Sequence, residues 1–95
     1  LISITMAKKR DLKRSINYIC SDLFAEAMAA AIYGNLENKE SADNLLSTII
    51  ITRNEFVSRI SHPEPGMKAS KYYRALINDF NQSTLDIVDK IGNLG

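Results

Sequence analysis

Several features of enzymes and of secreted or membrane proteins are scarce in this 95-residue chain. A single cysteine, Cys20, excludes an internal disulfide and a zinc site built from several cysteines. A single histidine, His62, argues against the dimetal site of helical bundles, which needs Glu-x-x-His on two facing helices. No apolar run approaches the roughly 18 to 20 residues that a membrane span needs. We therefore expect no membrane span, no metal, no cofactor and no enzyme activity.

The composition that remains is typical of a soluble globular domain, with 45% apolar and 24% charged residues. We expect one helical domain over residues 1–95, with residues 1–6 either disordered or an extension ahead of a native start at Met6. A signal peptide is the alternative, but its apolar part is too short and precedes the positive charges. Without a signal or a disulfide framework, we expect a cytoplasmic protein.

A first long helix is predicted from a start between Thr5 and Asp11 to Tyr33, and the rest of the chain is organised around it. Gly34 should end this helix in a left-handed conformation. The second half, from Phe24 to Tyr33, carries one charge and is apolar on nearly every side. The main stripe repeats at three- and four-residue steps and comprises Leu12, Ile16, Ile19, Leu23, Ala27 and Ala30, widened by Cys20, Phe24 and Ala31.

A second helix is predicted after a short polar connection at residues 36–40, so the first two helices should be antiparallel neighbours. Ser41 is the expected N-cap, with Asp43 in the first turn. Ile51 points away from the stripe. The predicted buried face comprises Leu45, Leu46, Ile49, Ile50, Phe56, Val57 and Ile60.

Two prolines, Pro63 and Pro65, end the second helix and form a stiff corner. A third helix is predicted over residues 68–91, with Gly92 closing it. Tyr73 should face the core, with Tyr72 at the edge of the buried face. That face comprises Tyr72, Tyr73, Leu76, Ile77, Phe80, Thr84, Ile87, Val88 and Ile91.

Three such helices predict an all-α, antiparallel up-down-up three-helix bundle. Long helices leave a thin monomer with surplus apolar surface, so we expect two copies to pair into a six-helix homodimer. The candidate interface residues are Phe24, Met28, Ile32 and Ile51.

A charged residue, Arg53, falls in the middle of the apolar stripe of the second helix. A desolvated arginine needs a partner, and antiparallel pairing brings it level with Asp22, within a turn of Glu26. These three residues predict a buried polar cluster, formed within one chain or across an interface. Its ordinary role is an ion pair that fixes helix register; the alternative is a small-ligand or metal site.

Basic residues gather at the start of the first helix, although the whole chain has a net charge of +1. Between residues 6 and 20, five basic groups stand against Asp11, a net charge of +4. They are Lys8, Lys9, Arg10, Lys13 and Arg14. Such a group usually forms a solvated helix start. The alternative is contact with nucleic-acid phosphates, with Tyr18 as a stacking surface.

Two further side chains have ordinary structural interpretations. His62, at the end of the second helix, is expected to interact with the negative end of the helix dipole. Cys20, on the apolar side of the first helix, is expected to be a core thiol.

Two stretches, Arg10–Cys20 and Ser61–Gly66, resemble a group of small bacterial hypothetical proteins over the chain from Met6 onward. The resemblance implies a compact all-helical protein and assigns no activity to any residue. We expect a non-enzymatic protein–protein interaction or scaffold module. The alternatives are a nucleic-acid-associated protein or a bundle that binds a small ligand or metal.

Overall fold

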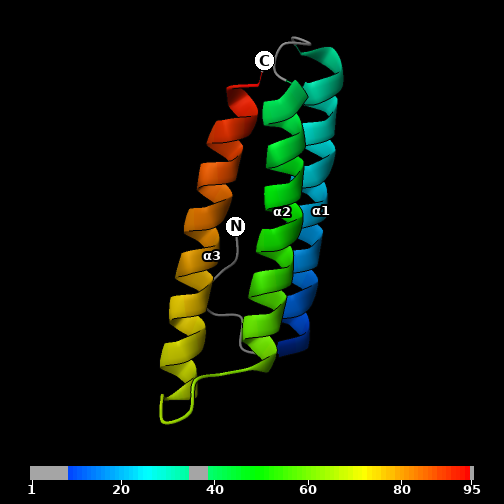
Figure 1. Cartoon of the computed structure of the whole chain (residues 1–95). Helices are drawn as coiled ribbons and strands as arrows, with labels where there is room; N and C mark the ends of the chain where they lie inside the picture. The colour runs from blue at the N-terminus through cyan, green and yellow to red at the C-terminus, as the bar shows by residue number, and fades with distance from the viewer. Residues whose placement is uncertain (1–8, 35–38, 95) are drawn as a thin grey trace.

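Three long antiparallel helices form the protein in a computed structural model, which describes residues 9–34 and 39–94. Helix α1 spans Lys9–Tyr33, α2 spans Lys39–Ser61 and α3 spans Ala69–Gly92. The chain runs up, down and up, so α1 and α3 begin at the same end of the bundle (Figure 1). The predicted all-α three-helix bundle is confirmed. The predicted extension at residues 1–6 lies outside the described residues.

The bundle is long and thin, with extents of 48 × 20 × 17 Å. Its radius of gyration is 14.7 Å, whereas a compact domain of this length has about 12 Å. A helix of 25 residues is about 37 Å long at 1.5 Å per residue, so helix length sets this shape. A thin bundle buries a smaller share of each helix than a compact one does.

The core of α1 follows the predicted stripe. Its buried residues are Leu12, Ile16, Cys20, Leu23 and Ala27, and Ile19, Phe24, Ala30 and Ala31 pack against them partly buried. Tyr18 and Ile32, which lie away from this stripe, are 74% and 69% exposed. The predicted buried stripe of this helix is therefore confirmed.

Helix α2 differs from its prediction at its start and at one side chain. It begins at Lys39, so Ser41 lies inside the helix and is not its N-cap, and Glu40 takes the place in the first turn that was predicted for Asp43. Ile50 is 45% exposed, because it lies at the edge of the buried stripe. Ile51 is 63% exposed, as predicted.

Helix α3 matches its predicted bounds within a residue and buries Leu76, Ile77, Phe80 and Ile87 among others. Val88 was predicted to be buried but is 50% exposed. The predicted roles of the two tyrosines are reversed. Tyr72 is buried and Tyr73 is half-buried, and the hydroxyls of both reach backbone carbonyls at the end of α2.

The proline corner is closed by hydrogen bonds to the end of α2. The Tyr72 hydroxyl lies 2.9 Å from the carbonyl oxygen of Arg59 and 3.2 Å from that of His62. The Tyr73 hydroxyl donates to the carbonyl of Ile60 at 3.0 Å, and His62 Nδ1 donates to the carbonyl of Ser58 at 2.8 Å. The last carbonyls of a helix have no partner within the helix. These side chains satisfy them, which confirms the predicted capping role of His62.

Gly34 ends α1 at the predicted place but for a different reason. Gly66 is the one glycine with a positive φ among the described residues, at 83°, so Gly34 is not left-handed. A Cβ at Gly34 would lie 2.5 Å from the carbonyl oxygen of Ala30 and 3.0 Å from that of Leu94. The end of α1 therefore comes close to the end of α3, and the space there fits only a residue without a side chain.

Candidate functional site

A surface groove runs between α1 and α2 and has a volume of about 360 Å³. All of the residues that line it belong to these two helices, and most are apolar. They are Cys20, Ser21, Phe24, Ile49, Ile50 and Arg53. The groove therefore marks the side of the bundle where α1 and α2 are not covered by α3.

Exposed apolar side chains continue from the groove along both helices. Met28 and Ile32 follow Phe24 at four-residue steps on α1, and they are 43% and 69% exposed. On α2, Leu46 precedes Ile50 by four residues and is partly buried. We call the surface formed by Phe24, Met28, Ile32, Leu46 and Ile50 the α1–α2 face. Three of its residues, Phe24, Met28 and Ile32, were predicted as an interface, whereas Ile51 lies further round α2.

Arg53 is the one charged group lining this groove, and it is exposed. Its Nη2 donates to Oδ1 of the neighbouring Asn54 at 2.7 Å. Among the residues that the structure describes, the only ion pair joins Arg59 and Asp79 at 3.1 Å, so Arg53 faces the groove without a carboxylate partner. Its guanidinium is close enough to Cys20 to favour the thiolate form of that residue.

The predicted polar cluster does not form in the single chain. Asp22 and Glu26 are exposed, as is Arg53, and no ion pair joins them within the described ranges. At about 100° per residue, Asp22 is turned about 160° from Cys20 around α1, and Glu26 about 120° in the same sense. Arg53 is level with these carboxylates, as predicted, but it packs on the Cys20 flank of α1. The prediction of a buried cluster is therefore wrong for one chain.

Cys20 is a buried thiol at the floor of the groove, with 2% of its surface exposed. Burial raises its pKa, because the low-polarity surroundings disfavour the thiolate, and the positive charge of Arg53 opposes this rise. The thiolate is the nucleophilic form of cysteine. A raised pKa and little access make Cys20 a core residue, as predicted.

The basic residues at the start of α1 lie at the same end of the bundle as the start of α3. Lys9, Arg10 and Arg14 are exposed and Lys13 is partly exposed, whereas Lys8 lies outside the described residues. Three further exposed basic residues lie at the start of α3: Lys68 is its N-cap residue, and Lys71 and Arg74 lie within the helix. They were not predicted as part of the basic group, although the up-down-up order brings the two helix starts to the same end.

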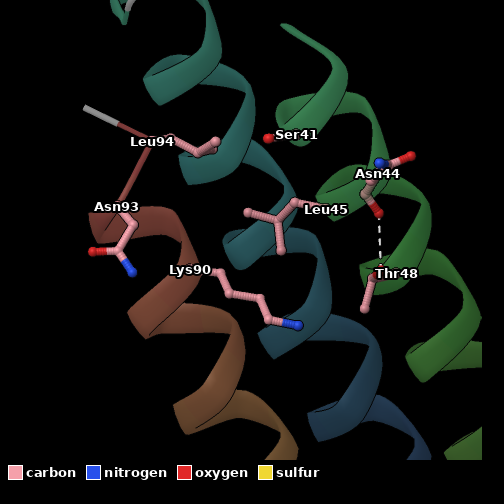
Figure 2. A pocket seen from close by; sticks show the side chains of 7 residues that line it. All are labelled: Ser41, Asn44, Leu45, Thr48, Lys90, Asn93 and Leu94. Carbon is pink, nitrogen blue, oxygen red and sulfur yellow. Dashed lines mark hydrogen bonds between the residues drawn. The ribbon is translucent and has the colours of Figure 1, made fainter. Parts of the chain in front are cut away.

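A second hollow, of about 350 Å³, lies at the opposite end of the bundle between the start of α2 and the end of α3. Figure 2 shows Lys90 extending from α3 towards α2, where the Thr48 hydroxyl donates to the backbone carbonyl of Asn44 at 2.8 Å. Leu45 and Leu94 form an apolar floor. One ammonium group above apolar side chains suits a small anion with an apolar part, and the sequence analysis did not identify this place.

No three His, Cys, Asp or Glu side chains come together as a possible metal site within residues 9–34 and 39–94. Over the same ranges, none of the helices combines the length and the apolar character needed to cross a membrane. The buried side-chain nitrogen and oxygen atoms of these residues all have hydrogen-bond partners, so no orphaned buried side chain points to a missing ligand. The α1–α2 face is therefore the strongest candidate site.

Comparisons with protein-family models, with curated proteins and with solved structures found no match. No relative therefore supplies a function or a site residue. The resemblance of Arg10–Cys20 and Ser61–Gly66 to small bacterial proteins remains a prediction.

Proposed function

We propose that this protein is a non-enzymatic protein–protein interaction module that associates with itself through the α1–α2 face. The observation that carries the proposal is the apolar groove between α1 and α2 together with the exposed Met28, Ile32 and Ile50 beside it. Contiguous exposed apolar surface of this kind marks interaction sites on soluble proteins. The proposal retains the cytoplasmic location expected from the sequence.

The shape of α1 supports close packing by another helix. Ala25 and Ala29 are exposed on its outer side, beside the larger Met28 and Ile32. Small side chains let a second helix approach, while the larger ones supply apolar area. Glu26 is the one charge in this half of α1, so association here removes few charged groups from water.

Analytical ultracentrifugation over a range of protein concentrations tests the proposal. We expect a dimer for the natural chain and a monomer for Ile50→Asp, because the new carboxylate would be buried without a partner. Leu85→Asp is the matched control: Leu85 on α3 is 51% exposed, close to the 45% of Ile50, but it lies outside the face. A natural chain that stays monomeric at all concentrations would disprove self-association.

A second candidate function is binding of nucleic acid at the basic end of the bundle. It is supported by the position of Lys71 and Arg74 of α3 at the same end as Arg10 and Arg14 of α1. Fluorescence anisotropy with DNA and RNA oligonucleotides should then show affinity that falls as salt rises. Arg14→Glu should weaken binding, and Lys90→Glu at the other end should not. If the protein does not bind these oligonucleotides even at low salt, nucleic-acid binding is ruled out.

A further inference from the structure

We propose that the α1–α2 face is occupied by a second copy of this chain in antiparallel two-fold register, with Asp43 of each copy paired with Arg53 of the other. This inference rests on the proposed self-association and specifies how the two copies are oriented relative to each other. It names Asp43 as an interface residue and gives Arg53 a partner that the single chain does not supply.

The two charges lie on the same side of α2. At about 100° per residue, Asp43 is turned about 20° from Ile50 around the helix, and Arg53 about 60° in the other sense. Both residues are exposed, and neither belongs to the Arg59–Asp79 ion pair, the only one among the described residues. They are ten residues apart, which is about 15 Å along the helix axis.

The arrangement is self-complementary about Thr48. Asp43 and Arg53 lie five residues before and after it, and Leu46 and Ile50 lie two residues before and after it. A two-fold axis that lies between the two copies, at right angles to α2 and at the level of Thr48, therefore brings each aspartate level with an arginine. The same rotation brings each leucine to an isoleucine. A two-fold interface requires this match of one surface patch with itself.

The same two-fold axis also brings apolar residues of α1 together. Phe24 lines the groove together with Ile49 and Ile50, so it is level with the middle of the α2 segment. The rotation brings it close to Phe24 of the second copy, and the exposed Met28 extends this apolar centre. The result is an apolar core with charged residues at the rim, as in many protein interfaces. An axis parallel to the helices would instead leave Arg53 level with Arg53 of the second copy.

Charge reversal tests this register. In the full chain, Asp43→Lys and Arg53→Glu should each raise the dimer dissociation constant by about tenfold to a hundredfold, because each places like charges together at two symmetric positions. The double variant carries both reversals and should return to within about threefold of the natural chain, since opposite charges meet again. Glu55→Lys, an exposed reversal elsewhere on α2, should leave the constant unchanged.

The outcomes separate the two proposals. A monomeric natural chain overturns both of them. A dimer whose dissociation constant responds to Asp43→Lys and Arg53→Glu no more than to Glu55→Lys overturns the register and leaves self-association standing. Weakening by both single reversals without rescue in the double variant overturns the Asp43–Arg53 pairing. Circular dichroism should show the same helix content in all variants.

A cross-link provides a second measurement that does not depend on charge. Ser47 is exposed, lies one residue from the level of the proposed axis and is turned about 60° from Ile50, so Ser47→Cys places the two thiols at nearly the same level in the dimer. In a Cys20→Ala background, mild oxidation should yield disulfide-linked dimers. Glu55→Cys in the same background should remain mainly monomeric on a non-reducing gel. Equal cross-linking of the two variants would contradict the register.

Discussion

The hydroxyl of Tyr73, at the start of α3, donates a hydrogen bond to the carbonyl oxygen of Ile60, at the end of α2, at 3.0 Å. This bond spans the corner formed by Pro63 and Pro65, and the neighbouring Tyr72 makes a similar contact to Arg59 at 2.9 Å. The two rings also meet edge to face, with centroids 5.3 Å apart. The corner is thus held by side chains that complete the hydrogen bonding of a helix end.

Removing the hydroxyl of Tyr73 should weaken this corner. Tyr73→Phe keeps the ring but leaves a carbonyl of α2 without its donor, so the free energy of unfolding should fall by about 0.5 to 1.5 kcal/mol. Urea unfolding followed by circular dichroism measures the change. Tyr18→Phe is the control, since Tyr18 is 74% exposed and should unfold like the natural chain. Equal stability of the two variants would show that water replaces the hydrogen bond at no cost.

Two glycines should respond oppositely to alanine. Gly34→Ala places a methyl group 2.5 Å from the Ala30 carbonyl oxygen, so it should lower the free energy of unfolding by about 1 to 3 kcal/mol. A Cβ at Gly92, within α3, meets nothing within 4 Å, so Gly92→Ala should raise stability by up to about 1 kcal/mol. Thermal unfolding compares the pair. A Gly34→Ala variant as stable as the natural chain would show that the end of α1 moves away from the carbonyl oxygens of Ala30 and Leu94 at little cost.

Stability should fall in alkaline solution because of Cys20. Its pKa is raised in the folded chain by burial, so the unfolded chain loses the thiol proton at a lower pH than the folded chain does. The stability gained from the neutral thiol is complete below the unfolded pKa, roughly 8.5, and is lost as the pH rises towards the folded value. Urea unfolding of the natural chain and of Cys20→Ala should show the smaller alkaline decrease in the variant. If the free energies of unfolding of the natural chain and of Cys20→Ala fell equally as the pH rises, this effect of Cys20 would be contradicted.

Packing between α2 and α3 should matter more than their ion pair. Phe80 is fully buried and meets Phe56 edge to face, with ring centroids 5.2 Å apart. Phe80→Ala should cost about 3 to 5 kcal/mol. The Arg59–Asp79 pair is partly exposed, so Asp79→Asn should cost less than about 1 kcal/mol. Denaturant unfolding measures both; a larger loss from Asp79→Asn would reverse this order.

The predictions from the sequence agree best with the structure for features that depend on a single helix. The exposure of Ile51 follows from a local signal, the 3.6-residue period. The end of α1 at Tyr33 was predicted correctly from Gly34, although this glycine does not adopt the expected left-handed conformation. Errors arise at the edges of the stripes, where Ile50 and Val88 are exposed. The period locates the centre of a buried stripe, but its width depends on how neighbouring helices cover it.

The candidate sites show the same limit. The sequence placed Arg53 level with Asp22 and Glu26, and the level is correct, but the side is not. The level of Arg53 along the bundle follows from the number of residues in each helix and from the antiparallel turn between them. The side of α1 that Arg53 meets depends on the rotation of α1 about its own axis, and the spacing of residues within α2 gives no information about that rotation. For that reason Arg53 shares a groove with Cys20.

By itself, the sequence determined three helices, their antiparallel order, the proline corner and the centres of the buried stripes, because proline and the 3.6-residue apolar period act locally. The tertiary structure alone decided which flanks of α1 and α2 lie side by side, and so where the groove with Arg53 opens. It also decided the capping of α2 by Tyr72 and Tyr73 and the close approach at Gly34. These features depend on the rotation and spacing of whole helices, which are set by the packing of all their side chains together.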